Sequence, residues 1–511
     1  MIGPPMSVTD RTIARTQAPS PEPPSEPTDR QRWDHRLTGA LLALGVLAVV
    51  TLFAVFQTYP NYDTYYALVW GKELANWQLP DYDVLRTPTP HPLSTLVGWV
   101  LAPFGAAGDR ILVLASLFGL LGLYVATFVL TERLLGRMIA LIAVAVMLTR
   151  TDMQLLALRA VFDLPFYLMV FGAAVLELRR PRCGWPVLAV LCLAGLLRPE
   201  AWLLAGAYWL WLAPVTPRPV LIRHAALVAV APLVWLVGDL VATGEPLYSL
   251  TSTREVSGEF GRDRGLLDAI ARVPEYAGGN EPIVTVVVGG LGLLLAVYIL
   301  RCRAALPLAI GGLGIATFLI IAAAGLSVIP RYMTIPSLLL SLCVAVALGG
   351  WTLVESRTPR RLAIGIAIVS ALLVGWRAPH YYRDYTELAD QARFVEAQHE
   401  DLGAVLDAPR VVAALQQCTP ITLPTHSAIP VIRYETGLPK EALEASIAQA
   451  RPPDRGVLLI GRTFNFEPGT GRANASRKPR VSARRPWSNK PLAGFEPIGG
   501  SGRWRAYARC R

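Results

Sequence analysis

The chain has few charged residues for its length. Asp, Glu, Lys and Arg make up 17% of its 511 residues, while hydrophobic residues make up 53%. A soluble domain carries about a quarter charged residues, because its surface must be solvated. The composition therefore excludes an ordinary soluble protein and indicates that lipid surrounds most of the chain.

Cysteine is also scarce, and acidic residues are outnumbered by basic ones. No pair among the 6 cysteines has the spacing of a zinc site, which argues against a structural metal. Lys and Arg exceed Asp and Glu by 48 to 37, but they lie in short clusters beside apolar runs. This distribution indicates membrane topology and gives no reason to expect nucleic acid as a partner.

Long apolar runs are plentiful. The run at 37–58 has no small-residue cleavage site and predicts an uncleaved signal anchor, while the Pro-rich residues 1–36 before it predict a disordered cytoplasmic tail. Together the runs predict a polytopic α-helical membrane protein of about eleven transmembrane helices. The other ten lie near residues 109–130, 138–150, 162–178, 186–197, 200–213, 224–242, 282–300, 304–327, 332–354 and 362–378.

Arginines between the runs predict the orientation. If the N-terminal tail is cytoplasmic, every short Arg-rich loop also falls on the cytoplasmic side, as the positive-inside rule requires. An odd number of spans then places the C-terminus outside, where Cys418 and Cys510 could form a disulfide. We therefore expect a multi-pass protein of the plasma membrane with a cytoplasmic N-terminus and an extracytoplasmic C-terminal domain.

The chain is expected to have two folded parts. A transmembrane domain covers 37–378, with long outer loops at 59–108 and 243–281, and an extracytoplasmic α/β domain covers 379–511. Within the latter, an amphipathic helix is predicted from Leu388, Ala392, Val395, Leu402 and Leu406 on one face. Strands are predicted at 420–423, 456–461 and 503–508, with a basic loop at 469–490.

The first outer loop opens with NYDTYY at residues 61–66. The following residues place Ala67, Trp70, Leu74 and Trp77 near one face of a helix, which indicates a helix lying in the membrane interface. Asp63 stands at its start. The carboxylate could act as a general base at the membrane surface, or it could simply cap the helix N-terminus, and the two roles are compatible.

The same loop resembles the GT-C superfamily of membrane glycosyltransferases, most of all actinobacterial-type members. The features that carry the resemblance are an acidic residue after the first span, the interfacial helix, LPDYD at 79–83 and PTPHPL at 88–93 before an apolar stretch. The resemblance covers residues 37–378 and implies a polyprenyl-phosphate sugar donor on the outer face. It also implies that Asp63 is the catalytic base, although many relatives have a paired acidic motif where Asp63 has Tyr62 and Thr64 as neighbours.

The chemistry of such a transfer needs few protein groups. A sugar that leaves from its phosphate needs one base for the acceptor hydroxyl and fixed cations for the phosphate, so the carboxylate pair of a hydrolase is unnecessary. Candidate substrate-binding residues lie at the outer ends of the predicted spans. They are Arg159, Arg198 and Glu200 in LLRPEAW, Arg331 and Tyr332 in IPRY, and His91, Asp81 and Asp83 in the first outer loop.

Each candidate also has a structural interpretation. Arg198 and Glu200 could pair with each other between two short helices, and arginines at span ends commonly reach toward lipid headgroups. Asp81 and Asp83 could hold the acceptor or a divalent metal, but aspartates in a Pro-rich loop are common turn formers. No metal or other cofactor is required by the sequence.

The sequence thus predicts an inverting hexosyl- or pentosyltransferase. It would transfer a sugar from a polyprenyl phosphate to an extracytoplasmic acceptor, which could be a cell-envelope glycan, a lipid or a protein. A transporter or flippase is the alternative, but the middle of the spans is nearly bare of ionisable residues. A non-catalytic membrane protein that retains the fold is the third interpretation.

Overall fold

The computed structural model describes residues 29–279, 283–449, 452–461 and 491–510. Most of the tail expected at 1–36, and the basic loop expected at 469–490, lie outside the described residues. The chain divides into two compact units, Met1–Ala48 and Val49–Arg511. Helix α1 (Asp29–Val55) begins in the first unit, earlier than predicted, and ends in the second.

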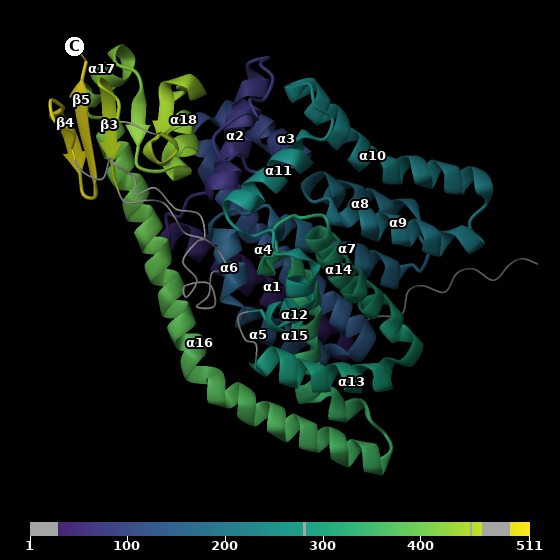
Figure 1. Ribbon diagram of the computed structural model, residues 1–511. Helices are drawn as coiled ribbons and strands as arrows, with labels where there is room; N and C mark the ends of the chain where they lie inside the picture. The colour runs from purple at the N-terminus through teal and green to yellow at the C-terminus, as the bar shows by residue number, and fades with distance from the viewer. Residues whose placement is uncertain (1–28, 280–282, 450–451, 462–490, 511) are drawn as a thin grey trace, which may run out of the picture. The chain divides into compact units, whose positions relative to one another are not determined.

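A helix is present at every apolar run that was predicted to span the membrane (Figure 1). Among the described residues, however, only six helices are long and apolar enough to cross a membrane, or seven if the broken pair α5 and α6 counts as one span. The chain is therefore a multi-pass membrane protein, but the count of eleven spans is not confirmed. The helices after α1 are α2 (Tyr62–Ala75), α3 (Pro92–Leu101), α4 (Gly108–Leu135), α5 (Arg137–Leu148), α6 (Thr151–Leu158), α7 (Asp163–Arg179), α8 (Trp185–Leu197), α9 (Glu200–Leu212), α10 (Arg218–Thr243), α11 (Tyr248–Glu259), α12 (Gly265–Ala277), α13 (Gly289–Leu300), α14 (Ala305–Ala323), α15 (Thr334–Gly349) and α16 (Arg357–Leu406).

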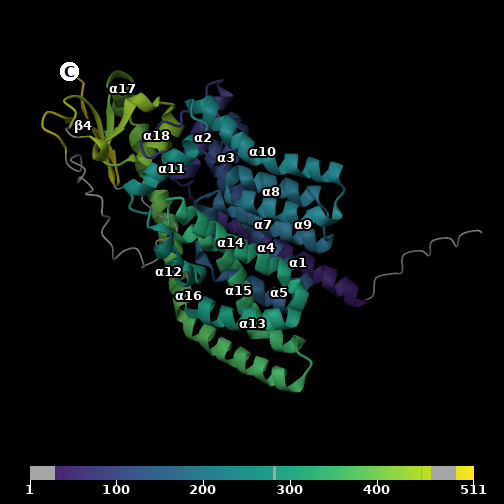
Figure 2. The same ribbon diagram turned by 45° about the vertical axis from the view of Figure 1, so that its right-hand side comes forward.

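The helices of the larger unit pack as neighbours along the chain and across it. The most extensive contacts join α13 with α15, α2 with α3, α4 with α7 and α5, and α7 with α8 (Figure 2). Helices α5 and α6 are bent by 64° at the break between them. At that break Arg150 donates to Asp152 and to the hydroxyls of Ser337 and Ser341 on α15, so a charged side chain at this depth is fully paired.

Helix α16 joins two elements that were predicted to be separate. It is one helix of 50 residues that contains both the last apolar run and the amphipathic segment. The predicted face is buried, including Leu388, Val395 and Leu402. Pro379 lies inside the helix, where it cannot donate a backbone hydrogen bond, and the ribbon of α16 bends along its length (Figure 1).

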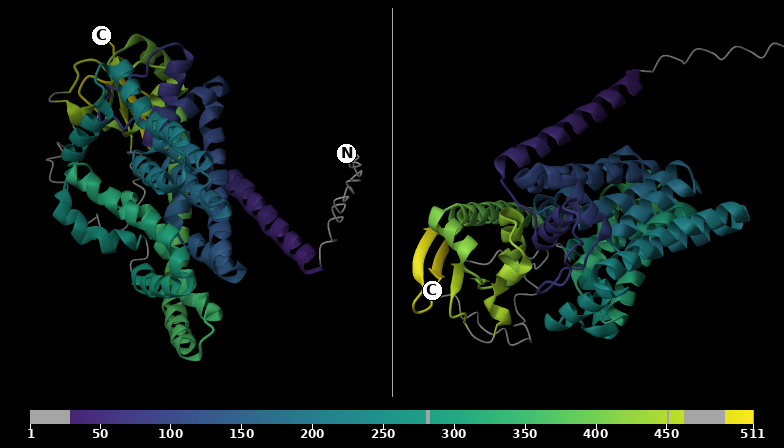
Figure 3. Two further views of the ribbon diagram at one scale, coloured as in Figure 1. Left: turned by 90° about the vertical axis from the view of Figure 1, so that its right-hand side faces the viewer. Right: turned by 90° about the horizontal axis from the view of Figure 1, so that it is seen from above.

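The C-terminal region forms a five-stranded mixed sheet with the order β2-β1-β3-β5-β4, at one end of the larger unit (Figure 3). The pairs β1–β2 and β1–β3 are parallel, and β3–β5 and β4–β5 are antiparallel. The three predicted strands are present. The bounds are β1 (Ile421–Leu423), β2 (Leu443–Ala445), β3 (Gly456–Ile460), β4 (Glu496–Ser501) and β5 (Trp504–Arg509), with helices α17 (Pro409–Gln417) and α18 (Ile429–Thr436).

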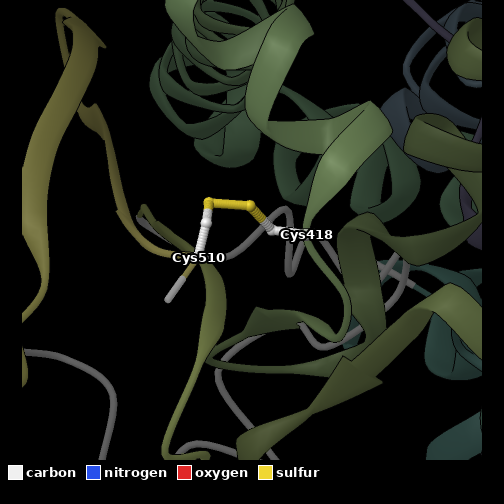
Figure 4. Close-up of a disulfide and its surroundings, with 2 residues drawn as sticks. All are labelled: Cys418 and Cys510. Carbon is white, nitrogen blue, oxygen red and sulfur yellow. A yellow bond between two sulfur atoms is a disulfide. The ribbon is translucent and has the colours of Figure 1, made fainter.

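A disulfide joins the two ends of this region. Cys418, which follows α17, is bonded to Cys510, which follows β5, with the two Cα atoms 5.4 Å apart (Figure 4). This is the pair that the sequence analysis proposed. The bond closes a loop of 92 residues that includes every strand of the sheet.

The sheet region is attached to the first outer loop through α18. Arg433 of α18 contacts Glu73 of α2 at 2.8 Å, and Lys72 donates to the carbonyl of Tyr434 at 2.8 Å. The Lys72 ammonium also lies 3.5 Å from the centre of the Tyr434 ring. Charged hydrogen bonds of this kind fix two surfaces in one register, so α2 is held in place by the C-terminal region.

Candidate functional site

Asp63 lies in the first turn of α2, but it does not cap the helix. The cap is Asn61, whose side chain accepts the backbone N–H of Thr64 at 3.0 Å. The alternative role for Asp63 as an N-cap is therefore wrong, because the helix begins earlier than the sequence suggested. Asp63 is left with a side chain that is 36% exposed.

The start of α2 is fixed to a turn between α6 and α7. The backbone N–H of Asn61 donates to the carbonyl of Arg159 at 2.9 Å, and the Thr64 hydroxyl donates to the carbonyl of Ala160 at 2.9 Å. Ala160 has a φ of 48°, a conformation that costs a non-glycine residue energy and persists only where its surroundings impose it. These bonds hold the backbone of Asp63 in place.

Asp63 and four other charged side chains form a chain of alternating sign. Arg331 Nη1 lies 3.8 Å from Asp63 Oδ2, and Arg331 Nε lies 3.7 Å from Asp163 Oδ2. Asp163 Oδ1 in turn pairs with Arg198, whose Nε donates to Glu200 Oε1 at 2.9 Å. The order is therefore Asp63, Arg331, Asp163, Arg198 and Glu200, drawn from α2, the turn before α15, α7, and the junction of α8 with α9.

The two arginines in this chain of charges differ in how far their guanidinium groups are already paired and in how exposed they are. The side chain of Arg198 is 5% exposed and is held by two carboxylates. It also lies 5.0 Å from the centre of the Tyr332 ring. Arg331 is 38% exposed, its two carboxylate contacts are too long for hydrogen bonds, and its Nε has no hydrogen-bond partner among the described residues. Arg331 is the cation that can turn to an anion from outside.

A groove begins at these residues and continues between apolar side chains. The space inside it is about 20 Å³, which is room for about one water molecule. One end is lined by the charged residues and Tyr332, and the rest by hydrocarbon. The lining residues are Arg198, Glu200, Arg331 and Tyr332 at the polar end, with Phe166, Tyr167, Leu204, Ile310, Gly314, Thr317 and Ile335. The charged end and the apolar walls match the two parts of an amphiphile with an anionic head, but a space of this size holds such a ligand only after the lining side chains move apart.

His91 lies near both arginines of the site. Burial, followed by the charges of Arg198 and Arg331, lowers the pKa of the imidazole to about 3, so His91 is neutral at physiological pH. Its ring packs edge-on against Trp235 at 5.5 Å, and its Nδ1 has no hydrogen-bond partner in the described part of the chain. A neutral imidazole can hydrogen-bond a ligand but cannot hold a phosphate charge.

Three predicted site residues lie elsewhere. Arg159 is 4% exposed and faces a small cavity lined by Thr58, Gln391 and Val395, away from the groove. Asp81 pairs with Lys440 at 2.8 Å, and Asp83 lies 3.7 Å from the same ammonium. These contacts attach the first outer loop to the C-terminal region. The carboxylates therefore have a structural partner and do not join the groove.

Asp163 is the residue that the sequence analysis left without a role. It is 5% exposed and links Arg198 to Arg331. Its one sequence signal was its position in an outer turn close to Arg159. Within the described residues no group of three or more His, Cys, Asp or Glu side chains could hold a metal ion. The carboxylates near Asp63 are instead interleaved with arginines.

The comparisons with known proteins agree with this architecture. No family model matches the chain, and no curated protein matches its sequence. Among solved structures, the chain is similar to ArnT from Cupriavidus metallidurans bound to undecaprenyl phosphate, with 14% identity and a TM-score of 0.51. The likeness covers 92% of this chain and 98% of that one. The chain is thus a polytopic membrane protein with a small C-terminal sheet region. Its fold is similar to that of ArnT, in agreement with the polytopic helical fold and small C-terminal α/β region that the sequence predicted.

Proposed function

We propose that this protein is a membrane glycosyltransferase that uses a polyprenyl-phosphate sugar as donor. The observation that carries the proposal is the contact of 3.8 Å between Asp63 and Arg331, because Arg331 lines the polar end of an otherwise apolar groove. A cation and a base thus lie side by side where a lipid phosphate and a water-borne hydroxyl can meet. The undecaprenyl phosphate bound by ArnT supports a lipid phosphate as the ligand to test first.

In the proposed reaction each group has one task. Asp63 takes the proton of the acceptor hydroxyl, whose oxygen forms a bond to the anomeric carbon of the sugar. The bond from that carbon to the phosphate oxygen breaks, and the electron pair leaves with the phosphate. Arg331 stabilises the resulting charge, because a guanidinium can bind phosphate oxygens in a bidentate way. Attack opposite the leaving group inverts the configuration.

Four neighbouring residues serve this reaction indirectly, namely Arg198, Glu200, Tyr332 and His91. Arg198 holds Asp163 and Glu200 in place, and the ring of Tyr332 covers its guanidinium. His91 is a neutral, buried neighbour of both arginines. The sugar is a hexose or pentose, and the acceptor a glycan, lipid or protein outside the cytoplasm, on which side we also place the C-terminal region.

The test compares wild type with Asp63→Asn in reconstituted vesicles supplied with a panel of polyprenyl-phosphate sugars and acceptors. A general base contributes on the order of 10²–10⁴-fold in rate, so the variant should lose nearly all transfer while remaining folded. Asp83→Asn is the matched control, because Asp83 is 92% exposed and lies outside the groove. Equal rates for wild type and Asp63→Asn would refute the role of Asp63. No transfer by wild type across the panel would favour the transporter or non-catalytic interpretation.

A further inference from the structure

Arg331 touches two carboxylates and is bound tightly by neither. Its contacts of 3.8 Å with Asp63 and 3.7 Å with Asp163 exceed the 2.7–2.9 Å that is typical of charge-assisted hydrogen bonds. Arg198, the other arginine in the chain of charges, is bound tightly, with a hydrogen bond of 2.9 Å to Glu200. Arg331 therefore lies between two carboxylates, at a distance too long for a hydrogen bond to either.

The exposures of these side chains indicate which of them an incoming anion reaches first. Asp163 and Arg198 are each 5% exposed, whereas Arg331, which lines the groove, and its neighbour Asp63 are 38% and 36% exposed. An anion that enters the groove meets Arg331 before it can meet Arg198. Arg331 approaches Asp63 with Nη1, so a guanidinium that turns this group to such an anion gives up its contact with Asp63.

From this geometry we infer that Arg331 is exchanged between Asp63 and the donor phosphate, so that binding of the donor removes the ion-pair partner of the base. The inference rests on the proposed function. Before the exchange, the Arg331 contact stabilises the carboxylate and opposes its protonation. After the exchange, Asp63 loses that stabilisation and becomes a stronger proton acceptor. The site would then activate its base only when a lipid phosphate is in place.

The exchange predicts an effect on binding that is the reverse of the effect on catalysis. Asp63 competes with the phosphate for Arg331, so Asp63→Asn should bind undecaprenyl phosphate more tightly than wild type does, by about two- to five-fold, the factor that corresponds to a partly exposed ion pair. Affinity would be measured by titrating the lipid into protein held in nanodiscs. Undecaprenol, which lacks the phosphate, serves as the control ligand, and its affinity should not change.

Removing the Asp63 charge could also tighten binding by removing direct repulsion of the phosphate. A double-mutant cycle separates the two causes. Arg331→Gln alone should weaken binding, and in that background Asp63→Asn should have no further effect if the exchange is real. An equal gain in both backgrounds would mean direct repulsion and would overturn the inference, as would no gain in the wild-type background.

A second measurement covers the case in which Arg331→Gln does not fold. Infrared difference spectra on addition of undecaprenyl phosphate should show a shifted carboxylate stretch in wild type that is absent from Asp63→Asn. Identical difference spectra for the two proteins would overturn the exchange. Failure of wild type to bind undecaprenyl phosphate at all would instead contradict the proposed function, so the two failures are distinguishable.

Discussion

At the scale of single residues, the site depends on which arginine is already paired. Sequence analysis located Arg198 and Arg331 at the outer ends of apolar runs and treated both as candidate phosphate ligands. The structure divides their roles, because Arg198 is enclosed by Asp163 and Glu200 while Arg331 lies at the mouth of the groove. Asp163 is distant from both in sequence, so no local pattern could reveal the pairing.

This division predicts different effects on stability. Arg198→Ala leaves Glu200, which is 12% exposed, without its cation and leaves Asp163, which is 5% exposed, with only the long contact to Arg331. Such a loss typically costs about 3–5 kcal/mol. Arg331→Ala removes two long, partly exposed contacts and should cost less than about 1 kcal/mol. Thermal unfolding in detergent should therefore show a much lower midpoint for Arg198→Ala than for Arg331→Ala. Similar midpoints for the two variants would contradict the assignment.

At the scale of elements, the close crossing of α2 and α3 fixes the helix that carries Asp63. Gly71 of α2 and Gly98 of α3 face each other, and a Cβ on either would overlap the backbone of the other helix. The sequence predicted α2 as an interfacial helix, but nothing in it indicated that Gly71 and Gly98 meet. A contact between two glycines has no hydrophobic or charge signature, so only the fold reveals it.

The crossing predicts that Gly98→Ala is disruptive. The added methyl must push α3 from the backbone of Ala67 and Leu68, and overpacking of this kind costs about 1–3 kcal/mol. Because α2 carries Asp63, transfer activity should fall together with the unfolding midpoint. Gly119→Ala on α4 is the matched control, since its Cβ meets nothing within 4 Å and alanine is the better helix former by about 0.5–1 kcal/mol. A control as damaging as Gly98→Ala would show that the crossing is not the cause.

At the scale of the whole molecule, the sequence predicted the class of fold well and the element boundaries less well. Apolar runs locate helices reliably because lipid tolerates little else, and a helix lies at each predicted run. The number of spans was less predictable, because several helices, such as α8 (Trp185–Leu197), are shorter than a bilayer requires. The attachment of Lys440 to Asp81 was not predictable either, because the two residues are far apart in the chain.

The disulfide and the orientation of the chain are linked, since Cys418 and Cys510 can remain bonded only on an oxidising side of the membrane. If the C-terminal region lies outside the cytoplasm, alkylation of the denatured protein should label four cysteines before reduction, which are Cys183, Cys192, Cys302 and Cys343, and six after it. Six labels without reduction would place the region in the cytoplasm and contradict the proposed orientation.

The same bond should also stabilise the sheet. Closing a loop of 92 residues restricts the unfolded chain, which is worth about 4 kcal/mol in chain-entropy estimates. Cys510→Ser should therefore lower the unfolding midpoint of the C-terminal region, and Cys418→Ser with Cys510→Ser should lower it no further, because one substitution already opens the loop. Cys302→Ser is the control, since Cys302 is exposed and unbonded. The unfolding midpoint of Cys302→Ser should equal that of wild type. A double variant that is clearly less stable than Cys510→Ser would show that the two cysteines stabilise the region through packing rather than through the disulfide.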